Sequence, residues 1–345
     1  MRTDDRGLRA PLLFALGCAI LFASLTAAPD LFPVNRASAN DSSASLDAGG
    51  LRLTFNPDIS VESEDLYISR EQVRVVYRFR NKSPHDISTL VAFPLPVMEI
   101  GEGGNYILHG KDPVNVIDFQ VTTDGRRVEP SVEIKATRFG VDVTDVLKRH
   151  GVPLTMRGGD ALNERLDNLP AEARRELERY GVIDWNSSFG ANNKPSANVH
   201  WDAHIAFYWF QTFPAGRSVE VTHRYSPAPR QFFFGDSDLA SAEMQKNYCI
   251  DPSFARAART RLQEAPQSAL SGFELKYVLT TAGNWLGPIQ KFRLTVAKSS
   301  PRALVSLCAD GIKRAGPTSY ELTRENYGPS EDLKILFVEP IGPDN

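Results

Sequence analysis

The chain has 345 residues, of which 42% are hydrophobic and 23% charged, and this composition excludes a disordered or collagen-like protein. Its formal net charge of −3 offers no basic field for nucleic acid, and three cysteines are too few for a disulfide scaffold or an array of zinc sites. The length predicts about two domains.

The N-terminal segment has the pattern of a secretory signal peptide. Three arginines within the first nine residues precede an uncharged run over residues 11–28, and Ala37-Ser38-Ala39 supplies the small residues of a cleavage site. We predict a signal peptide over residues 1–39, cleavage after Ala39, and a periplasmic or secreted protein. Two alternatives stay open: the apolar run remains as an uncleaved anchor, or Cys18 is lipidated. No other segment is apolar enough to cross a membrane, so no stable transmembrane helix is expected after cleavage.

Residues 40–50 are small and polar and predict a flexible start, after which the pattern is that of β-strands. Apolar residues alternate with arginines over residues 73–80, and residues 87–93 form a second strand that Pro94 ends. The Asp124-Gly125 pair between two apolar stretches predicts a β-hairpin.

Two stretches interrupt the β pattern. At about 140–195 the alternation is lost, and Pro170 and Gly181 bracket a helix. Alternation resumes in the segment Val199–Trp209, which predicts a strand with one buried face. A second helical stretch follows, with Asp251-Pro252 as a typical helix start.

Together these elements predict a mainly β protein, between all-β and α+β, made of two β-sandwich-like units with helical insertions. The N-terminal β-sandwich-like domain spans residues 40–232 and contains the helical insertion at about 140–195. A helical connector over residues 233–266 leads to a C-terminal β domain over residues 267–345.

Removal of the signal peptide leaves two cysteines, Cys249 and Cys308. An even pair in an oxidising compartment most often forms a disulfide, which is our prediction. The alternative is a reactive thiol at Cys249, close to the start of the helix that begins at Pro252.

His200, Asp202 and His204 share one face of a predicted strand, because side chains alternate along a strand. Two imidazoles and a carboxylate could hold zinc or iron. On a flat strand, however, such side chains stand about 6–7 Å apart, which favours an ordinary solvated face. The prediction is therefore no metal and no cofactor, with this trio as the alternative.

Aromatic residues crowd two of the strands and make both of their faces apolar. Such a strand is covered by another layer of the same chain, which the rarity of exposed apolar patches favours, or by a partner. The candidate ligand or partner surface consists of Trp201, Trp209, Phe232, Phe233 and Phe234. No catalytic motif is readable: G-x-S-x-G, H-E-x-x-H and a phosphate-binding glycine loop are all absent from the sequence.

The sequence resembles a bacterial family of exported proteins catalogued as domain of unknown function 4424. The matching segments are Ala39–Ala44 with Gly49-Gly50-Leu51, Ser63–Ser69, Tyr77–Ser83, Val91–Pro96, Cys249-Ile250-Asp251 and Leu304–Cys308. The resemblance supports export and the pairing of Cys249 with Cys308. It implies no catalytic residue and no ligand.

These observations favour an exported, non-enzymatic β-rich binding or structural module of the bacterial envelope, whose partner would be an envelope protein or a glycan and not a nucleic acid. One alternative is an envelope hydrolase or a carbohydrate-binding protein that uses the aromatic strands. The other is a metal-binding protein that uses the trio on the strand.

Overall fold

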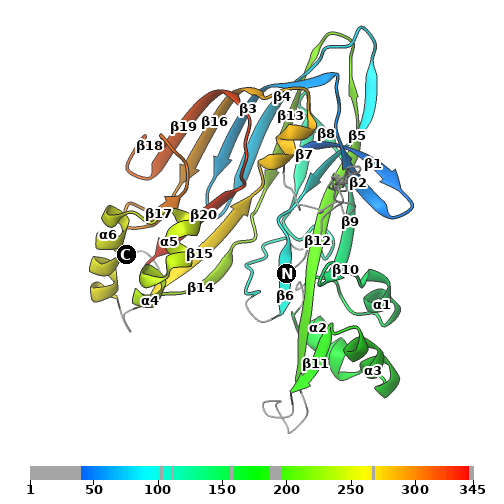
Figure 1. The fold of residues 1–345 in the computed structure, drawn as a ribbon, viewed down its shortest axis with the longest axis vertical. Coiled ribbons are helices and arrows are strands. Elements are labelled where there is room, and N and C mark those ends of the chain that lie inside the picture. Colours follow the sequence, from blue (N-terminus) through cyan, green and yellow to red (C-terminus); the bar gives the residue numbers. More distant parts are fainter. Residues whose placement is uncertain are drawn as a thin grey trace, which may run out of the picture. The chain divides into compact units, whose positions relative to one another are not determined.

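Three β-sheets form the framework of the described chain, which confirms the mainly β prediction (Figure 1). The computed structural model describes residues 40–101, 104–110, 112–155, 159–186, 196–265 and 269–341. The predicted signal peptide, its cleavage motif and Cys18 lie outside the described residues. None of the helices within those ranges is both long and apolar enough to cross a membrane.

The first sheet is built around the long strand β12 (Ser196–Phe213) and has the order β10-β9-β12-β5-β1-β2. Strands β6 and β11 also pair with β12. Its predicted apolar face is confirmed, because every second side chain from Val199 to Trp209 is buried. The other strands are β1 (Ser42–Asp47), β2 (Gly50–Thr54), β5 (Ile87–Pro94), β6 (Met98–Gly101), β9 (Ser131–Arg138), β10 (Val141–Asp142) and β11 (Ile183–Asn186).

The second sheet joins segments from the two ends of the chain. Its order is β18-β19-β16-β3-β4-β13-β7-β8, in which β3 (Ile59–Ile68) and β16 (Ile289–Ala297) pair in parallel. The predicted hairpin links β7 to β8, and both Asp124 and Gly125 have the positive φ that this tight turn requires. The remaining strands are β4 (Val73–Asn81), β7 (Gln120–Thr123), β8 (Arg126–Val128), β13 (Ser218–Tyr225), β18 (Lys313–Arg314) and β19 (Ser319–Tyr327).

The third sheet, of order β14-β15-β20-β17, is covered by helices. Strand β20 has two buried faces, since Ile335 and Phe337 belong to the main core while Leu336 and Val338 pack with residues of the helices. The elements are β14 (Arg230–Phe234), β15 (Leu270–Tyr277), β17 (Leu304–Leu307), β20 (Leu333–Glu339), α4 (Asp236–Ala240), α5 (Ala242–Tyr248) and α6 (Pro252–Glu264). Asp251 caps α6 as predicted, accepting hydrogen bonds from two backbone N–H groups.

The helical insertion consists of α1 (Thr144–Arg149), α2 (Gly159–Asp167) and α3 (Ala171–Arg179). These helices contact β9, β12 and β11 respectively, at one end of the long strand (Figure 1). Helix α3 buries Ala173 and Leu177, whereas Tyr180, directly after the helix, is exposed.

One apolar core serves all three sheets. A single cluster of buried side chains includes Phe207 of β12, Leu294 of β16 and Phe337 of β20. The described residues also form one compact unit. The two β units predicted from the sequence therefore share both a sheet and a core.

The predicted disulfide between Cys249 and Cys308 is present, with Cα atoms 5.0 Å apart. Cys249 directly follows α5, and Cys308 directly follows β17. The bond therefore ties α5 to the edge strand of the third sheet.

Replacing both cysteines with serine should lower the free energy of unfolding. The bond joins residues separated by 59 positions, and for such a loop the chain-entropy model predicts a loss of about 4 kcal/mol. Urea denaturation of the oxidised protein, the reduced protein and the double variant would measure it. Equal unfolding midpoints in all three samples would contradict the prediction.

Candidate functional site

Polar side chains lie fully enclosed within the apolar core. They come from the segment before β1 and from strands β3, β4, β13 and β15, and each exposes 2% of its surface or less. We call this set the polar core: Asn40, Asp41, Glu64, Tyr77, His223 and Tyr277.

Asn40 is held through all of its polar groups. Its backbone N–H donates to Oγ1 of Thr281 (3.0 Å), and the same hydroxyl donates back to the carbonyl of Asn40 (2.9 Å). The side-chain Nδ2 donates to Oε2 of Glu64 (3.2 Å), while Oδ1 accepts hydrogen bonds from the Tyr77 hydroxyl and the Asp41 backbone N–H. The predicted flexible start is therefore wrong here, because these first residues are among the most enclosed in the described chain.

Several atoms of the polar core have no hydrogen-bond partner in the part of the chain that the structure describes. They are both carboxylate oxygens of Asp41, Oε1 of Glu64 and both ring nitrogens of His223. Burial raises the pKa of Asp41 well above its usual value and that of Glu64 to about 8, and it lowers the pKa of His223 to about 3. With Asn40 joined to residue 39 by a peptide bond, burial therefore favours the neutral form of all three groups. The 3.5 Å contact between Asp41 Oδ1 and His223 Nε2 is then not an ion pair.

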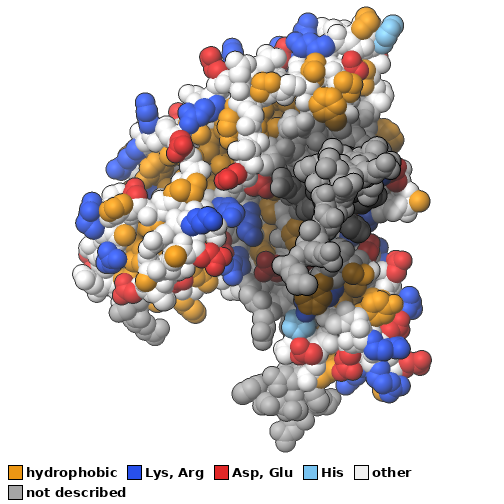
Figure 2. Space-filling view, in the orientation of Figure 1, with side chains coloured by type: hydrophobic (Ala, Val, Ile, Leu, Met, Phe, Trp, Pro, Cys, Tyr) orange, Lys and Arg blue, Asp and Glu red, His pale blue; other side chains and the backbone are white. Residues whose placement is uncertain are grey.

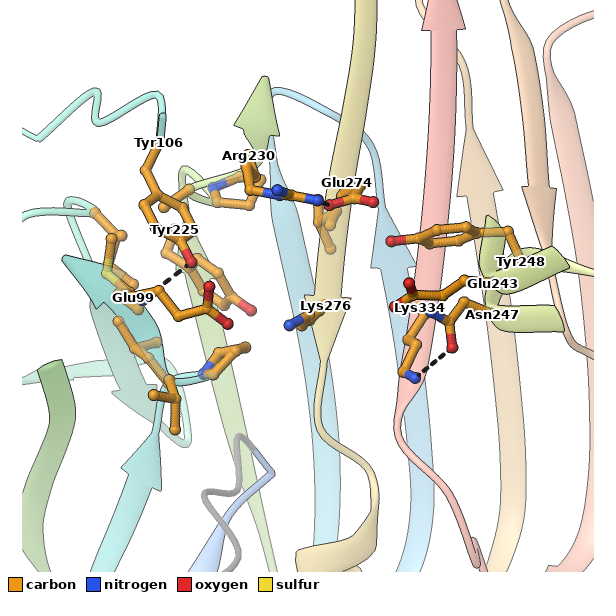
Figure 3. Close-up of a pocket in the computed structure, with 18 residues that line it drawn as sticks. Glu99, Tyr106, Tyr225, Arg230, Glu243, Asn247, Tyr248, Glu274, Lys276 and Lys334 are labelled. Atoms are coloured by element: carbon orange, nitrogen blue, oxygen red, sulfur yellow. Dashed lines mark hydrogen bonds and ion pairs between the residues drawn. The ribbon is translucent and has the colours of Figure 1, made fainter. Parts of the chain in front are cut away.

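A pocket of about 390 Å³ lies where parts of all three sheets meet α5 (Figure 3). Its walls are residues 95–99 at the start of β6, the segment 225–230 between β13 and β14, residues 274–276 of β15, and one face of α5. The volume lies in the range of roughly 300–1,000 Å³ that is typical of small-molecule sites.

Some charged groups of the pocket are paired and others are not. The guanidinium of Arg230 donates to Oε2 of Glu274 (2.6 Å), and Lys334 donates to Asn247 Oδ1 (3.0 Å). The side chains of Glu99, Glu243 and Lys276 have no hydrogen bond or ion pair within the described ranges. Figure 3 shows Glu99 and Lys276 projecting into the pocket from opposite walls, with the hydroxyl of Tyr225 between them.

Tyr225 connects the pocket to the core. It lies two residues after His223 on β13, so both side chains point to the same face of that strand. Its ring packs on that of Phe93 at a centroid distance of 5.6 Å, and burial raises its pKa. The inner wall of the pocket therefore rests on side chains fixed by the core.

The two histidines of the alternative metal site, His200 and His204, have different hydrogen-bond partners. His200 Nε2 is hydrogen-bonded to Asp184 (2.7 Å) and His204 Nε2 to Thr137 (2.9 Å). Burial lowers the pKa of His204. Within the described parts of the chain, no group of three or more His, Cys, Asp or Glu side chains is arranged to hold a metal ion, and this includes the group with Asp202.

The aromatic residues proposed as a surface do not lie on one surface. Trp201 and Trp209 are 2% and 4% exposed, and Phe234 is fully buried against α6. Phe233 is exposed and Phe232 is half-buried. The two tryptophans are therefore unavailable to the carbohydrate or ester that the alternative function required.

Comparison with known proteins places the chain in a family. The model of a family described as a domain of unknown function (DUF4424) matches residues 39–336. The chain belongs to this family. No curated protein matches it.

Among solved structures, this member of the family is similar to a putative nutrient binding protein from Legionella pneumophila subsp. pneumophila str. Philadelphia 1. The two chains share 16% identity with a TM-score of 0.42, over 87% of this chain and 70% of the other. Similarity at this level does not identify a ligand for this chain.

The segments that carry the family resemblance supply residues to both sites. Three of them contribute Asn40 with Asp41, Glu64 and Tyr77 to the polar core, and a fourth contributes Leu95 and Pro96 to the pocket. This was the only signal in the sequence for either site. The charged pocket residues come from segments far apart in the chain, and no local pattern links them.

Replacing Tyr77 with phenylalanine should destabilise the protein by about 1–3 kcal/mol, since Oδ1 of Asn40 loses a buried donor. Tyr180→Phe removes an exposed hydroxyl and serves as the control. Both variants would be compared with the parent by chemical denaturation. Equal effects of the two substitutions would show that the Tyr77 hydroxyl does not stabilise the core.

Proposed function

We propose that this protein is an exported, non-enzymatic binding protein and that the pocket between β6, β15 and α5 holds a small zwitterionic molecule. The observation that carries this proposal is one pocket of about 390 Å³ in which Lys276, Glu99 and Glu243, charges of both signs, have no partner among the described residues.

The charges favour a ligand that carries both signs. The six charged side chains of the lining are Glu99, Arg230, Glu243, Glu274, Lys276 and Lys334, so the lining has no net charge. A ligand carboxylate would pair with the ammonium of Lys276, and a ligand ammonium with Glu99 or Glu243. A free amino acid or a short peptide has this chemistry.

The remaining lining suits the uncharged part of such a ligand. Tyr106, Tyr225 and Tyr248 offer flat apolar rings with a polar tip, and Leu95 and Ile117 add an aliphatic wall. Convergent polar groups that fix the orientation of a ligand, beside aromatic side chains that contact its apolar part, are features of small-molecule sites. This lining therefore supports binding rather than a purely structural role.

Export is supported by two independent features. The first nine residues and the uncharged run that follows have the order of a signal peptide, ending in Ala37-Ser38-Ala39. The bond between Cys249 and Cys308 is of a kind that persists in oxidising compartments outside the cytosol.

Lys276→Gln should weaken binding of a zwitterionic amino acid or dipeptide about tenfold or more, the effect of losing one charge-assisted hydrogen bond. Calorimetric titration with a panel of amino acids, dipeptides and neutral sugars would measure it. Lys313→Gln, on the exposed strand β18, removes the same charge away from the pocket and should have no effect. A panel with no binder at millimolar concentration, or binding unchanged in Lys276→Gln, would contradict the proposal.

A further inference from the structure

We propose that cleavage after Ala39 converts the backbone nitrogen of Asn40 into the positive counter-ion of the polar core. In this step water adds across the amide bond: Ala39 leaves with the new carboxylate, and Asn40 keeps its nitrogen as a protonated α-amine. The cleaving agent, a signal peptidase, rests on the export proposed above. The role of the ammonium does not depend on what the pocket binds.

The nitrogen of Asn40 already lies inside the core. Asn40 exposes 2% of its surface, and its N–H donates to Oγ1 of Thr281 at 3.0 Å. The same residue reaches Glu64 through its side chain, and Asp41 follows it in the chain. As an amide this nitrogen has one hydrogen, which Thr281 accepts. As an ammonium it has three, which leaves two for further acceptors.

The same enclosed cluster contains acceptors that lack a donor among the described residues. Within the described ranges, both oxygens of Asp41 and Oε1 of Glu64 have no hydrogen-bond partner, although Asp41 is fully buried and Glu64 is 1% exposed. Buried polar atoms in native proteins are nearly always paired, so atoms of this kind call for an explanation. The three unpaired oxygens of Asp41 and Glu64 are explained if the nitrogen of Asn40 becomes a cation.

The charges of the cleaved form balance. One ammonium neutralises one carboxylate, and the other carboxyl group can keep its proton and donate it. With Asp41 ionised, the imidazole of His223 at 3.5 Å is placed to supply an N–H to Oδ1. A buried ion pair of this kind is stable only when further hydrogen bonds satisfy its partners. Thr281 accepts a hydrogen bond from the nitrogen of Asn40, and the Asn40 side chain donates one to Glu64.

The sequence independently places the predicted cleavage motif directly before Asn40. Ala37-Ser38-Ala39 directly precedes Asn40, and the family match begins at residue 39. The residue that cleavage would free is thus the residue whose side chain bonds Glu64 and whose chain neighbour is Asp41. Export and folding would then be coupled, because the precursor lacks the cation that its core requires.

The test compares two forms of the protein, one beginning at Asn40 and one retaining Ser38 and Ala39. At pH 7 the form that begins at Asn40 should unfold at a temperature about 5 °C or more above that of the extended form. This difference is the loss of stability expected when one partner of a buried ion pair is missing. In that form Asp41→Asn and Glu64→Gln should each lower the unfolding temperature. In the extended form the same substitutions should leave it unchanged or raise it, since they remove a group that lacks its counter-ion.

Asp65→Asn is the matched control, because this neighbour of Glu64 on β3 is partly exposed and pairs with Arg293. Its effect should be the same in both forms. Equal unfolding temperatures of the two forms, or equal effects of Asp41→Asn in both, would overturn the proposal. The cleaved form is prepared in vitro, so this result is independent of whether the chain is exported and of what the pocket binds.

A second measurement applies if the extended form does not fold. Acetic anhydride should modify the α-amine of the native Asn40 form far more slowly than exposed lysines, and at an ordinary rate once the protein is unfolded. Labelling at the rate of the exposed lysines in the native state would overturn the proposal. If the extended form carrying both Asp41→Asn and Glu64→Gln still does not fold, the proposal is also overturned. The steric bulk of Ser38 and Ala39, and not the missing charge, would then explain why the extended form does not fold.

Discussion

The attachment of residues 40–43 to the segment 280–285 is the contact on which the rest of the fold depends. Thr281 holds the backbone of Asn40, the indole of Trp285 donates to the carbonyl of Asp41 (2.7 Å), and Asn284 donates to the hydroxyl of Ser42 (2.8 Å). These bonds join the start of β1 to the 3-10 turn between β15 and β16 (Thr280–Asn284). They bring together parts of the chain separated by more than 200 positions.

The pocket depends on these hydrogen bonds because its walls belong to strands that pack on the same core. Tyr225 continues the buried face of β13 from His223 into the pocket, and Lys276 precedes the core residue Tyr277 on β15. The opposite wall, α5, is fixed by the disulfide at Cys249. Acidic and basic side chains are interspersed over the visible face in Figure 2, so no single-sign field on that face directs a highly charged partner.

The sequence predicted the local elements and missed the long-range assembly. Alternation along β4 and β12, the Asp124-Gly125 turn and the Asp251 cap each depend on neighbouring residues, and each was predicted correctly. The parallel pairing of β3 with β16 has no local signature, and neither does a pocket assembled from several segments. Residues 40–43 were predicted to be flexible because small polar residues are typical of loops, whereas here they are buried against partners far away in the chain.

Native-state hydrogen exchange tests this account most directly. If the attachment of residues 40–43 holds the single core together, the amides of β1 and of residues 278–285 should exchange only through global unfolding, with the same free energy and the same dependence on denaturant. Exchange of the β1 amides by local opening, at a far lower free energy and without dependence on denaturant, would contradict it. The chain would then have a frayed start beside an independently stable core.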